Sequence, residues 1–343
     1  MTPSPKLQCA AAYQQIVAAS LGKQATTEPL LPAVWPLAKA NHLLLAVWRG
    51  QGCPEDLDAA WTEQVNKAAQ FEAETAVAVQ EIIPQFTAVD LPLFAIKSFL
   101  PFPYADSNLD IVTAKPERQA EYKALLRELG YRPFRNLADL REPMKQTYQK
   151  DGVRLRLHLH TAVSWNGVVY LPLGQVWQRR RLWPTADQSV WIPSAEDELL
   201  IMAAHAWFEN KLVSLHEILY WRELVQTDLD WAYLTKTAQE AGWSKGFMQF
   251  MGIVSQLASL LGIPTTIPLP LPTVPLSDSI WLPYVFPVRQ NWPVTSQKMA
   301  ADWRRGEWHK LPRQLFSYLL VDHFWMYRKA YRKWREVTAV SCS

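Results

Sequence analysis

The sequence predicts an α+β protein in which a small mixed sheet lies between two helical regions. The outer regions, residues 1–90 and 194–343, contain segments with apolar residues near the 3.6-residue period of an amphipathic helix. The central region, residues 91–193, contains short apolar runs and one segment, 153–160, in which apolar and polar residues alternate without exception. Because these strand signals surround a single clear helix, we expect three parts: an N-terminal helical region, a mixed-sheet core and a C-terminal helical region.

Two patterns predict helices in the N-terminal region. Residues 40–48 form an apolar run rich in Ala and Leu. Residues 55–83 combine strong helix formers with a helical repeat at Leu57, Trp61, Val65, Ala68, Phe71 and Thr75. We expect this helix to stop at Pro84, because proline has no amide hydrogen and its ring collides with the preceding turn.

The central region begins with two short strands, predicted at Leu93–Ile96 and Leu109–Thr113. A helix is expected from Pro116, a residue tolerated in a first helical turn, to Gly130, a common C-cap. One face of this helix is formed by Tyr122, Leu125, Leu126 and Leu129. Residues 131–134 then lead into further strands.

The alternating segment 153–160 is the clearest strand of the chain. Another strand, Val168–Leu171, is expected after a turn at Asn166-Gly167. The apolar face of segment 153–160 consists of Val153, Leu155, Leu157 and Leu159, and its polar face of Arg154, Arg156, His158 and His160.

The C-terminal region opens with a capping-box pattern at Ser194–Asp197 and is predicted to continue through several helices to Leu261. Residues 262–275 are rich in proline and are expected to form an extended connector. A last helix is predicted over 311–337. Its segment 324–335 interleaves aromatic and basic residues, which fits contact with a membrane surface, nucleic acid or partner protein, or a docked helix with a solvated basic side. We favour the docked helix.

Composition narrows the class of protein. The net charge of +3 is too balanced to indicate an acidic partner or nucleic acid. We find no signal-peptide pattern and no membrane span, and we expect a cytoplasmic protein. The three cysteines, Cys9, Cys53 and Cys342, are scattered and fit free thiols in a reducing compartment. The 17 tryptophans fit helix contacts better than an aromatic cleft.

Candidate metal ligands lie at the second predicted strand. Asn108 and Asp110 share one face of this strand, and two carboxylates there would hold a divalent ion bound to a triphosphate. Here the first position is an amide, and Asp106 in the preceding loop is a further candidate. The alternative, a strand-end Asn/Asp turn without a ligand, carries more weight for this pair taken alone.

Candidate anion ligands lie on the alternating strand and after the first strand. The polar face with His158 and His160 suits phosphates, or the two histidines join Asp110 in a zinc or manganese site. A solvated outer face of a half-buried sheet is about equally plausible. Lys97-Ser98 is positioned to contact phosphate, or to leave the lysine charge in water. We interpret two further histidines, His205 and His216, as core or interface residues.

These residues resemble a family of largely uncharacterised nucleotidyltransferases that share the palm of DNA-polymerase-β-type enzymes. The likeness spans about Leu93 to Gly242, and the order of its landmarks carries it rather than any single motif. The landmarks are Ile96-Lys97-Ser98, Tyr104, Asp106, Asn108-Leu109-Asp110, Leu129-Gly130-Tyr131, His158-Leu159-His160, Ala203-Ala204-His205-Ala206, Leu215–Leu219 and Asp230-Trp231. The chain departs from the family pattern at Ser98 (Gly in the family), Asn108 (Asp) and His158 (an acid).

The resemblance implies transfer of a nucleoside monophosphate from an NTP to an unknown acceptor (a small molecule, an RNA or a protein) with Mg²⁺ or Mn²⁺. Lys97, Ser98, Arg154, Arg156 and His160 would bind the nucleotide. Catalysis would fall to Asp110 and His158, and metal binding to Asp110, Asn108 and Asp106. Because two acidic positions are lost, we keep a second hypothesis, a catalytically degenerate nucleotide- or anion-binding partner protein of the same fold. A third reading is a helical scaffold whose Trp-rich surfaces and basic tail bind other proteins or a membrane.

Overall fold

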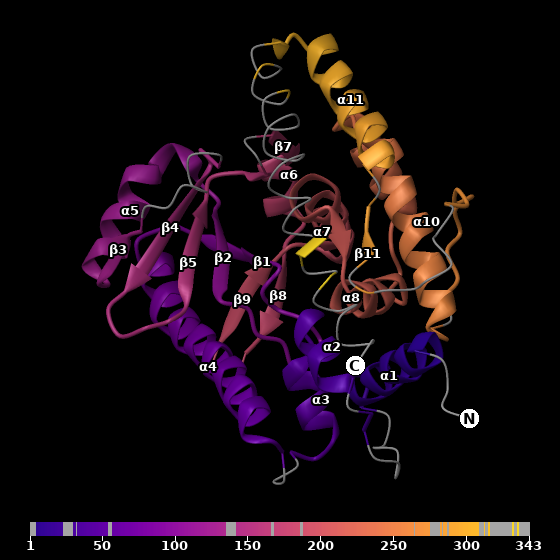
Figure 1. Cartoon of the computed structure of the whole chain (residues 1–343). Coiled ribbons are helices and arrows are strands. Elements are labelled where there is room, and N and C mark those ends of the chain that lie inside the picture. The colour runs from indigo at the N-terminus through magenta and orange to yellow at the C-terminus, as the bar shows by residue number, and fades with distance from the viewer. Residues whose placement is uncertain are drawn as a thin grey trace. The chain divides into compact units, whose positions relative to one another are not determined.

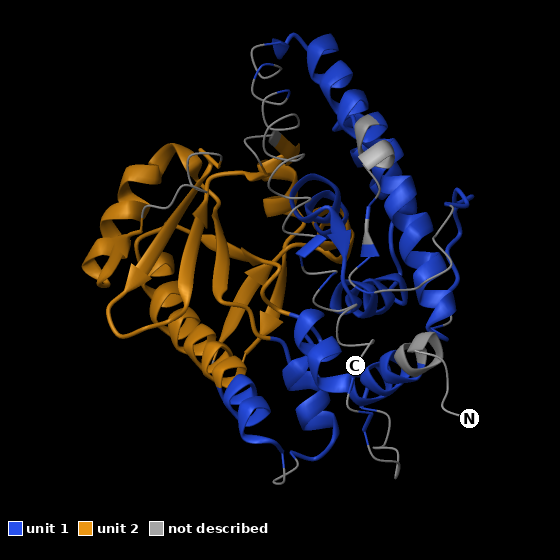
Figure 2. Ribbon diagram, in the orientation of Figure 1, with its two compact units in different colours: residues 1–66, 100–104, 202–343 blue, residues 67–99, 105–201 orange. Residues whose placement is uncertain are grey.

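The computed structural model divides into two compact units (Figure 2). One consists of residues 67–99 and 105–201, and we call it the sheet unit. The other consists of residues 1–66, 100–104 and 202–343, and we call it the helical unit. The structure describes residues 5–22, 30–31, 33–53, 57–134, 142–165, 168–185, 188–263, 265–274, 282, 284–286, 288–308, 312, 315, 331–332 and 335.

A five-stranded mixed sheet forms the centre of the sheet unit (Figure 1). Its spatial order is β1 (Leu93–Ile96), β2 (Asn108–Thr113), β5 (Arg156–His160), β4 (Lys145–Lys150) and β3 (Tyr131–Pro133). Only one pair of neighbours, β2 and β5, is parallel, and the other three pairs are antiparallel. The predicted α+β class with a small mixed sheet is therefore confirmed.

Helices α4 (Ala59–Ala88) and α5 (Gln119–Glu128) supply the apolar side chains that cover one face of this sheet. Because strand side chains alternate, residues of one parity face this core and the others face away. The core cluster contains Val79, Ile82, Phe86, Tyr122, Leu126, Leu109, Ile111, Tyr148, Leu155, Leu157 and Leu159. The intervening polar residues Asn108, Asp110, His158 and His160 belong to the opposite face.

Two local predictions were wrong. The helix does not stop at Pro84 but continues to Ala88. Pro84 removes only one amide donor, and it lies in the last turns of a 30-residue helix. The surrounding helical hydrogen bonds and the packing of Phe86 in the core stabilise the helix beyond the proline. The strand predicted from residue 153 begins at Arg156, because the amides of Arg154 and Leu155 donate to the Glu74 carboxylate of α4 instead.

The remaining elements of the sheet unit are short. They are a 3₁₀ turn η1 (Pro116–Arg118), helix α6 (Leu173–Gln178), the hairpin of β6 (Val163–Trp165) and β7 (Val168–Leu171), and the hairpin of β8 (Arg181–Pro184) and β9 (Ser189–Ile192). The predicted strand at Val168–Leu171 is present, and Gly130 follows α5 with a φ of +86°, the left-handed conformation that glycine adopts without strain.

The described part of the helical unit is built from helices of different lengths and one small two-stranded ladder. Its helices are α1 (Pro5–Ser20), α2 (Val34–Ala40), α3 (Leu44–Gly50), α8 (Leu215–Val225), α9 (Trp231–Glu240), α10 (Ser244–Leu260) and α11 (Val288–Arg304). Helix α7 (Ala195–Ala204) contributes residues up to Ile201 to the sheet unit and residues from Met202 to the helical unit, and it continues as a π-helical turn η2 (His205–Asn210). Strands β10 (Leu212–Val213) and β11 (Tyr284–Val285) pair antiparallel.

The predicted signals around these helices have mixed outcomes. Ser194 caps α7 as expected, because its hydroxyl accepts the Asp197 amide at 3.2 Å. Residues 265–274 form neither helix nor strand, as their prolines predict. Most of the helix predicted over 311–337, including the basic and aromatic segment 324–335, lies outside the described residues. None of the described helices has the length and apolar character needed to cross a membrane.

Candidate functional site

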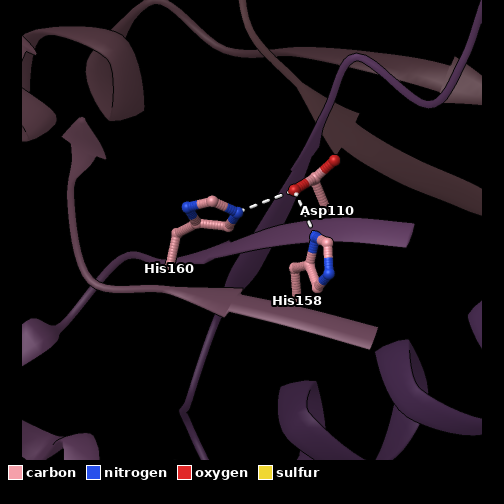
Figure 3. A group of neighbouring side chains, drawn as sticks. All are labelled: Asp110, His158 and His160. Atoms are coloured by element: carbon pink, nitrogen blue, oxygen red, sulfur yellow. Dashed lines mark hydrogen bonds and ion pairs between the residues drawn. The ribbon is translucent and has the colours of Figure 1, made fainter. Parts of the chain in front are cut away.

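Strands β2 and β5 place three polar side chains on one face of the sheet (Figure 3). In the parallel register Asp110 is opposite His158 and Val112 is opposite His160. Side chains two residues apart on a strand share a face, so both imidazoles lie on the same face of β5. On the neighbouring strand β2, the Asp110 carboxylate lies on that same face of the sheet. The alternation that predicted the strand is thus also what gathers these groups.

The Asp110 carboxylate accepts contacts from four donors. Its Oδ1 lies 3.1 Å from Nδ1 of His158 and 2.7 Å from Nε2 of His160. Its Oδ2 accepts the Asn108 amide at 2.8 Å and lies 3.4 Å from the Nζ of Lys97. If both histidines are neutral donors, His158 carries its proton on Nδ1 and His160 on Nε2. The single carboxylate is therefore saturated by nitrogen donors.

Burial and charge set the protonation of this group. Burial alone would raise the pKa of Asp110, but the Lys97 charge and the hydrogen bonds from both imidazoles outweigh it and hold that pKa well below its usual range. Burial lowers the pKa of His160 to about 4, against the opposing attraction of Asp110. At neutral pH the carboxylate is charged and His160 is neutral, which is the form of imidazole that ligates a metal.

The donor set fits a divalent ion. Within the described part of the chain, Asp110, His158 and His160 are the one group of three such side chains whose ligand atoms all lie within 4.8 Å of one another. One carboxylate oxygen and two imidazole nitrogens are ligands that zinc and manganese accept, whereas Mg²⁺ prefers oxygen alone. To ligate an ion, each imidazole nitrogen must give up the proton that it now directs at Asp110.

Lys97 and Ser98 lie beside this group, directly after β1. Lys97 has a φ of +58°, in the left-handed region, and its Nζ lies 5.6 Å from the centroid of the Trp165 ring. The Ser98 hydroxyl donates to the Ile96 carbonyl at 2.9 Å and accepts a long contact from the Asp110 amide at 3.4 Å. Both predicted phosphate contacts therefore adjoin the candidate metal ligands.

Three other predicted site residues make different contacts. The Asp106 carboxylate accepts the Ser107 amide at 2.6 Å, within its own loop. Arg154 is exposed. The Arg156 guanidinium is also exposed and stacks over the Phe134 ring, 4.8 Å from its centroid. None of these contacts is with the Asp110 group, and ligand roles for the three residues stay predictions.

Two residues near the group were missed by sequence reasoning. Trp165 packs beneath the Lys97 ammonium, and buried Thr147 pairs with His158 across β4 and β5. Strand β4 has the sequence Lys-Gln-Thr-Tyr-Gln-Lys, with a single apolar residue, so it gives no alternation signal. For Trp165 the strand itself was unpredicted, although its place just before the predicted turn at Asn166-Gly167 was a usable signal.

His205 and His216, the two further histidines considered in the sequence, belong to a network in the helical unit. His216 Nδ1 lies 2.8 Å from the Ser214 hydroxyl and 3.2 Å from the Asn41 carbonyl. Ser214 and Glu217 form a capping box at the start of α8. Burial alone would raise the pKa of Glu217, but hydrogen bonds and the nearby imidazoles, His205 first, lower it to about 2. These contacts fix the start of a helix, consistent with a structural role.

The five-stranded mixed sheet, with helices over its apolar face and candidate metal ligands on its other face, is consistent with a nucleotidyltransferase-like fold. Residues 20–259 match the model of a family described as "Uncharacterised nucleotidyltransferase", and the chain belongs to this family. The resemblance seen in the sequence is therefore confirmed. No curated protein and no solved structure matches the chain significantly.

Proposed function

We propose that this protein transfers a nucleoside monophosphate from an NTP to an acceptor, with a divalent ion held by Asp110, His158 and His160. The observation that carries the proposal is the convergence of their three ligand atoms on one face of the family's sheet, next to a lysine. A bound divalent ion would neutralise triphosphate charge and polarise the phosphorus that is attacked.

The residues of the group have separable tasks in this proposal. Lys97 and Ser98 bind phosphate oxygens, the lysine as a point charge. Asp110 supplies the one anionic ligand. The His158 side chain is 16% exposed and that of His160 only 3%. His158 is therefore the accessible imidazole ligand and His160 the buried one. Because its Nδ1 would bind the ion, the His158 ring keeps its proton on Nε2 and does not also act as the base.

The nitrogen ligands favour Mn²⁺ over Mg²⁺. Magnesium sites are built from carboxylate, phosphate and water oxygens, and the loss of an acid at Asn108 and at His158 removes two of them. Manganese accepts imidazole as well as carboxylate. We therefore expect activity and nucleotide binding to be supported by Mn²⁺ at concentrations where Mg²⁺ is ineffective.

Thermal unfolding with each of the four NTPs, alone and with Mn²⁺ or Mg²⁺, tests the proposal. We expect stabilisation by an NTP to require Mn²⁺ and to be lost in Asp110→Ala. In a separate assay with an NTP labelled at the α-phosphate, we expect the label to appear in an acceptor or in the protein itself. Stabilisation of the same size with and without metal would contradict the metal-dependent function.

One observation favours a second candidate function, a metal-independent anion-binding partner protein. All four contacts of Asp110 are made by nitrogen donors, and one of them is already a cation. A protein of this kind would bind triphosphate through Lys97, Arg156 and the imidazoles without transferring it. NTP stabilisation that persists in EDTA and disappears in Arg156→Ala would select this candidate and place Arg156 at the anion.

A further inference from the structure

We infer that Lys97 makes metal binding at Asp110 conditional on a polyphosphate. Its ammonium holds the carboxylate when no phosphate is bound, and a polyphosphate draws it away so that the divalent ion can take its place. The inference rests on the proposed metal site, but it concerns the order and coupling of binding rather than the reaction.

The backbone commits Lys97 to this position. A non-glycine residue at a φ of +58° adopts a conformation that L-residues rarely occupy, and such strain persists only where the surroundings hold it. Lys97 directly follows β1, and Ile96 pairs with Asp110 across β1 and β2. The ammonium lies 3.4 Å from Oδ2 of Asp110 and 5.6 Å from the Trp165 ring. A carboxylate on one side and an aromatic ring on the other fix the charge.

The charges of the group balance without a metal. Asp110 is the one acid among the three candidate ligands, and the Lys97 ammonium offsets its single negative charge. A divalent ion that binds alone must displace the ammonium from Oδ2 or accept a neighbouring positive charge. Either choice weakens its binding, because like charges a few ångströms apart repel strongly where water is scarce.

A polyphosphate removes this obstacle. Lys97 is the more accessible partner, with 22% of its side chain exposed against 5% for Asp110, so the lysine can turn toward solvent while the carboxylate stays. Phosphate oxygens are good acceptors for an ammonium, and a triphosphate brings several negative charges. Once Lys97 binds phosphate, Oδ2 is released, and the phosphate adds anionic ligands for the ion. By linkage, the ion and the polyphosphate then raise each other's affinity equally.

Metal binding without phosphate gives the first test. Free Mn²⁺ is measured by electron paramagnetic resonance in titrations of the wild-type chain, Lys97→Met, Lys97→Arg and Lys145→Met. Lys145 is the matched control, because it lies opposite His160 on the same sheet and its loss removes the same charge. Thermal unfolding confirms that each variant is folded.

We expect Lys97→Met to bind Mn²⁺ at least about 10-fold more tightly than the wild-type chain, within the usual range of coupling between sites. Lys97→Arg keeps the cation and should bind as weakly as the wild type. Lys145→Met should differ from the wild type by less than about 3-fold, because Lys145 acts on the neutral His160, and more weakly than Lys97 does. Equal Mn²⁺ affinity in Lys97→Met and the wild type would overturn the inference, whatever the other variants do.

A second titration uses tripolyphosphate as the probe. In the absence of metal, the wild-type chain should bind it, and Lys97→Met should bind it at least about 10-fold more weakly. Tripolyphosphate and Mn²⁺ also bind each other in the absence of protein. After this binding is subtracted, tripolyphosphate should still strengthen Mn²⁺ binding to the wild-type chain, and this gain should be smaller in Lys97→Met. Unchanged tripolyphosphate affinity in Lys97→Met would also overturn the inference.

The two proposals fail in different ways. Tighter Mn²⁺ binding by Lys97→Met that is abolished by adding Asp110→Asn supports the inference even if no NTP is ever transferred. Nucleotidyl transfer by a wild-type chain whose Mn²⁺ affinity does not respond to Lys97→Met supports the proposed function alone.

Discussion

Replacing Asp110 by asparagine tests how the carboxylate is held. The substitution keeps the shape of a buried side chain and removes its charge. The imidazoles lose a charged acceptor, and the amide that replaces Oδ2 faces two donors, Asn108 and Lys97. Breaking a buried charged pair costs about 3–5 kcal/mol. Because Lys97 can reach water, we expect a smaller loss of about 2–4 kcal/mol in the metal-free protein.

This loss has a defined pH dependence. The folded-state pKa of Asp110 lies well below its ordinary value of 3.8, so the carboxylate contributes stability above that pH and loses it as the pH falls through the folded-state pKa. The difference between wild type and Asp110→Asn should therefore be constant near neutrality and shrink in acid.

Urea unfolding with EDTA present, followed by circular dichroism at several pH values, measures the difference. Asp151→Asn is the control, because Asp151 is exposed and pairs with an exposed arginine, so its loss should change stability by less than about 0.5 kcal/mol. If Asp110→Asn is as stable as the wild type near neutral pH, the four donors do not hold the carboxylate as described.

Three further changes test other parts of the account. Asn108→Asp adds a second carboxylate beside Asp110, so the free energy of unfolding of the metal-free protein should fall by about 1–3 kcal/mol while its Mn²⁺ affinity rises at least about 10-fold. Calorimetry that shows no gain in Mn²⁺ affinity would remove Asn108 from the ligand set. Glu217→Gln should lower the free energy of unfolding by about 3 kcal/mol at neutral pH, because the folded-state pKa of Glu217 is about 2 and its ordinary pKa is 4.5. The charged carboxylate stabilises the fold above pH 4.5, and this contribution is lost as the pH falls toward 2. A urea midpoint equal to that of the wild type at pH 7 would contradict the capping-box account. Pro84→Ala restores an amide donor at an exposed position near the end of α4 and should raise the free energy of unfolding by about 1–3 kcal/mol, whereas a fall would mean that the proline ring makes a stabilising contact.

The sequence predicted the parts of the site that depend on local pattern. Alternation in residues 153–160 located β5 and put His158 and His160 on one face, and the spacing of Asn108 and Asp110 did the same for β2. Because β2 and β5 pair in parallel, the polar residues of both strands lie on one face of the sheet. The helix from Pro116 to Gly130 was visible because its apolar period and its C-terminal glycine agree.

What the sequence did not show depends on long-range contacts. The Lys97–Asp110 ion pair requires a left-handed backbone at Lys97, which no residue pattern announces. The Glu74 carboxylate on α4 accepts hydrogen bonds from the amides of Arg154 and Leu155, which would otherwise have extended β5 toward residue 153. The compact units combine segments far apart in the chain, which periodicity cannot reveal, and the three-part division at residues 90 and 193 stays a prediction.

A crystal structure of the chain with Mn²⁺ and a non-hydrolysable NTP analogue tests the central claim most directly. We predict an anomalous manganese peak bonded to Asp110, His158 and His160, with Lys97 moved from the carboxylate to a phosphate oxygen. A triphosphate bound while Lys97 still pairs with Asp110 and no manganese lies between the two imidazoles would contradict the claim.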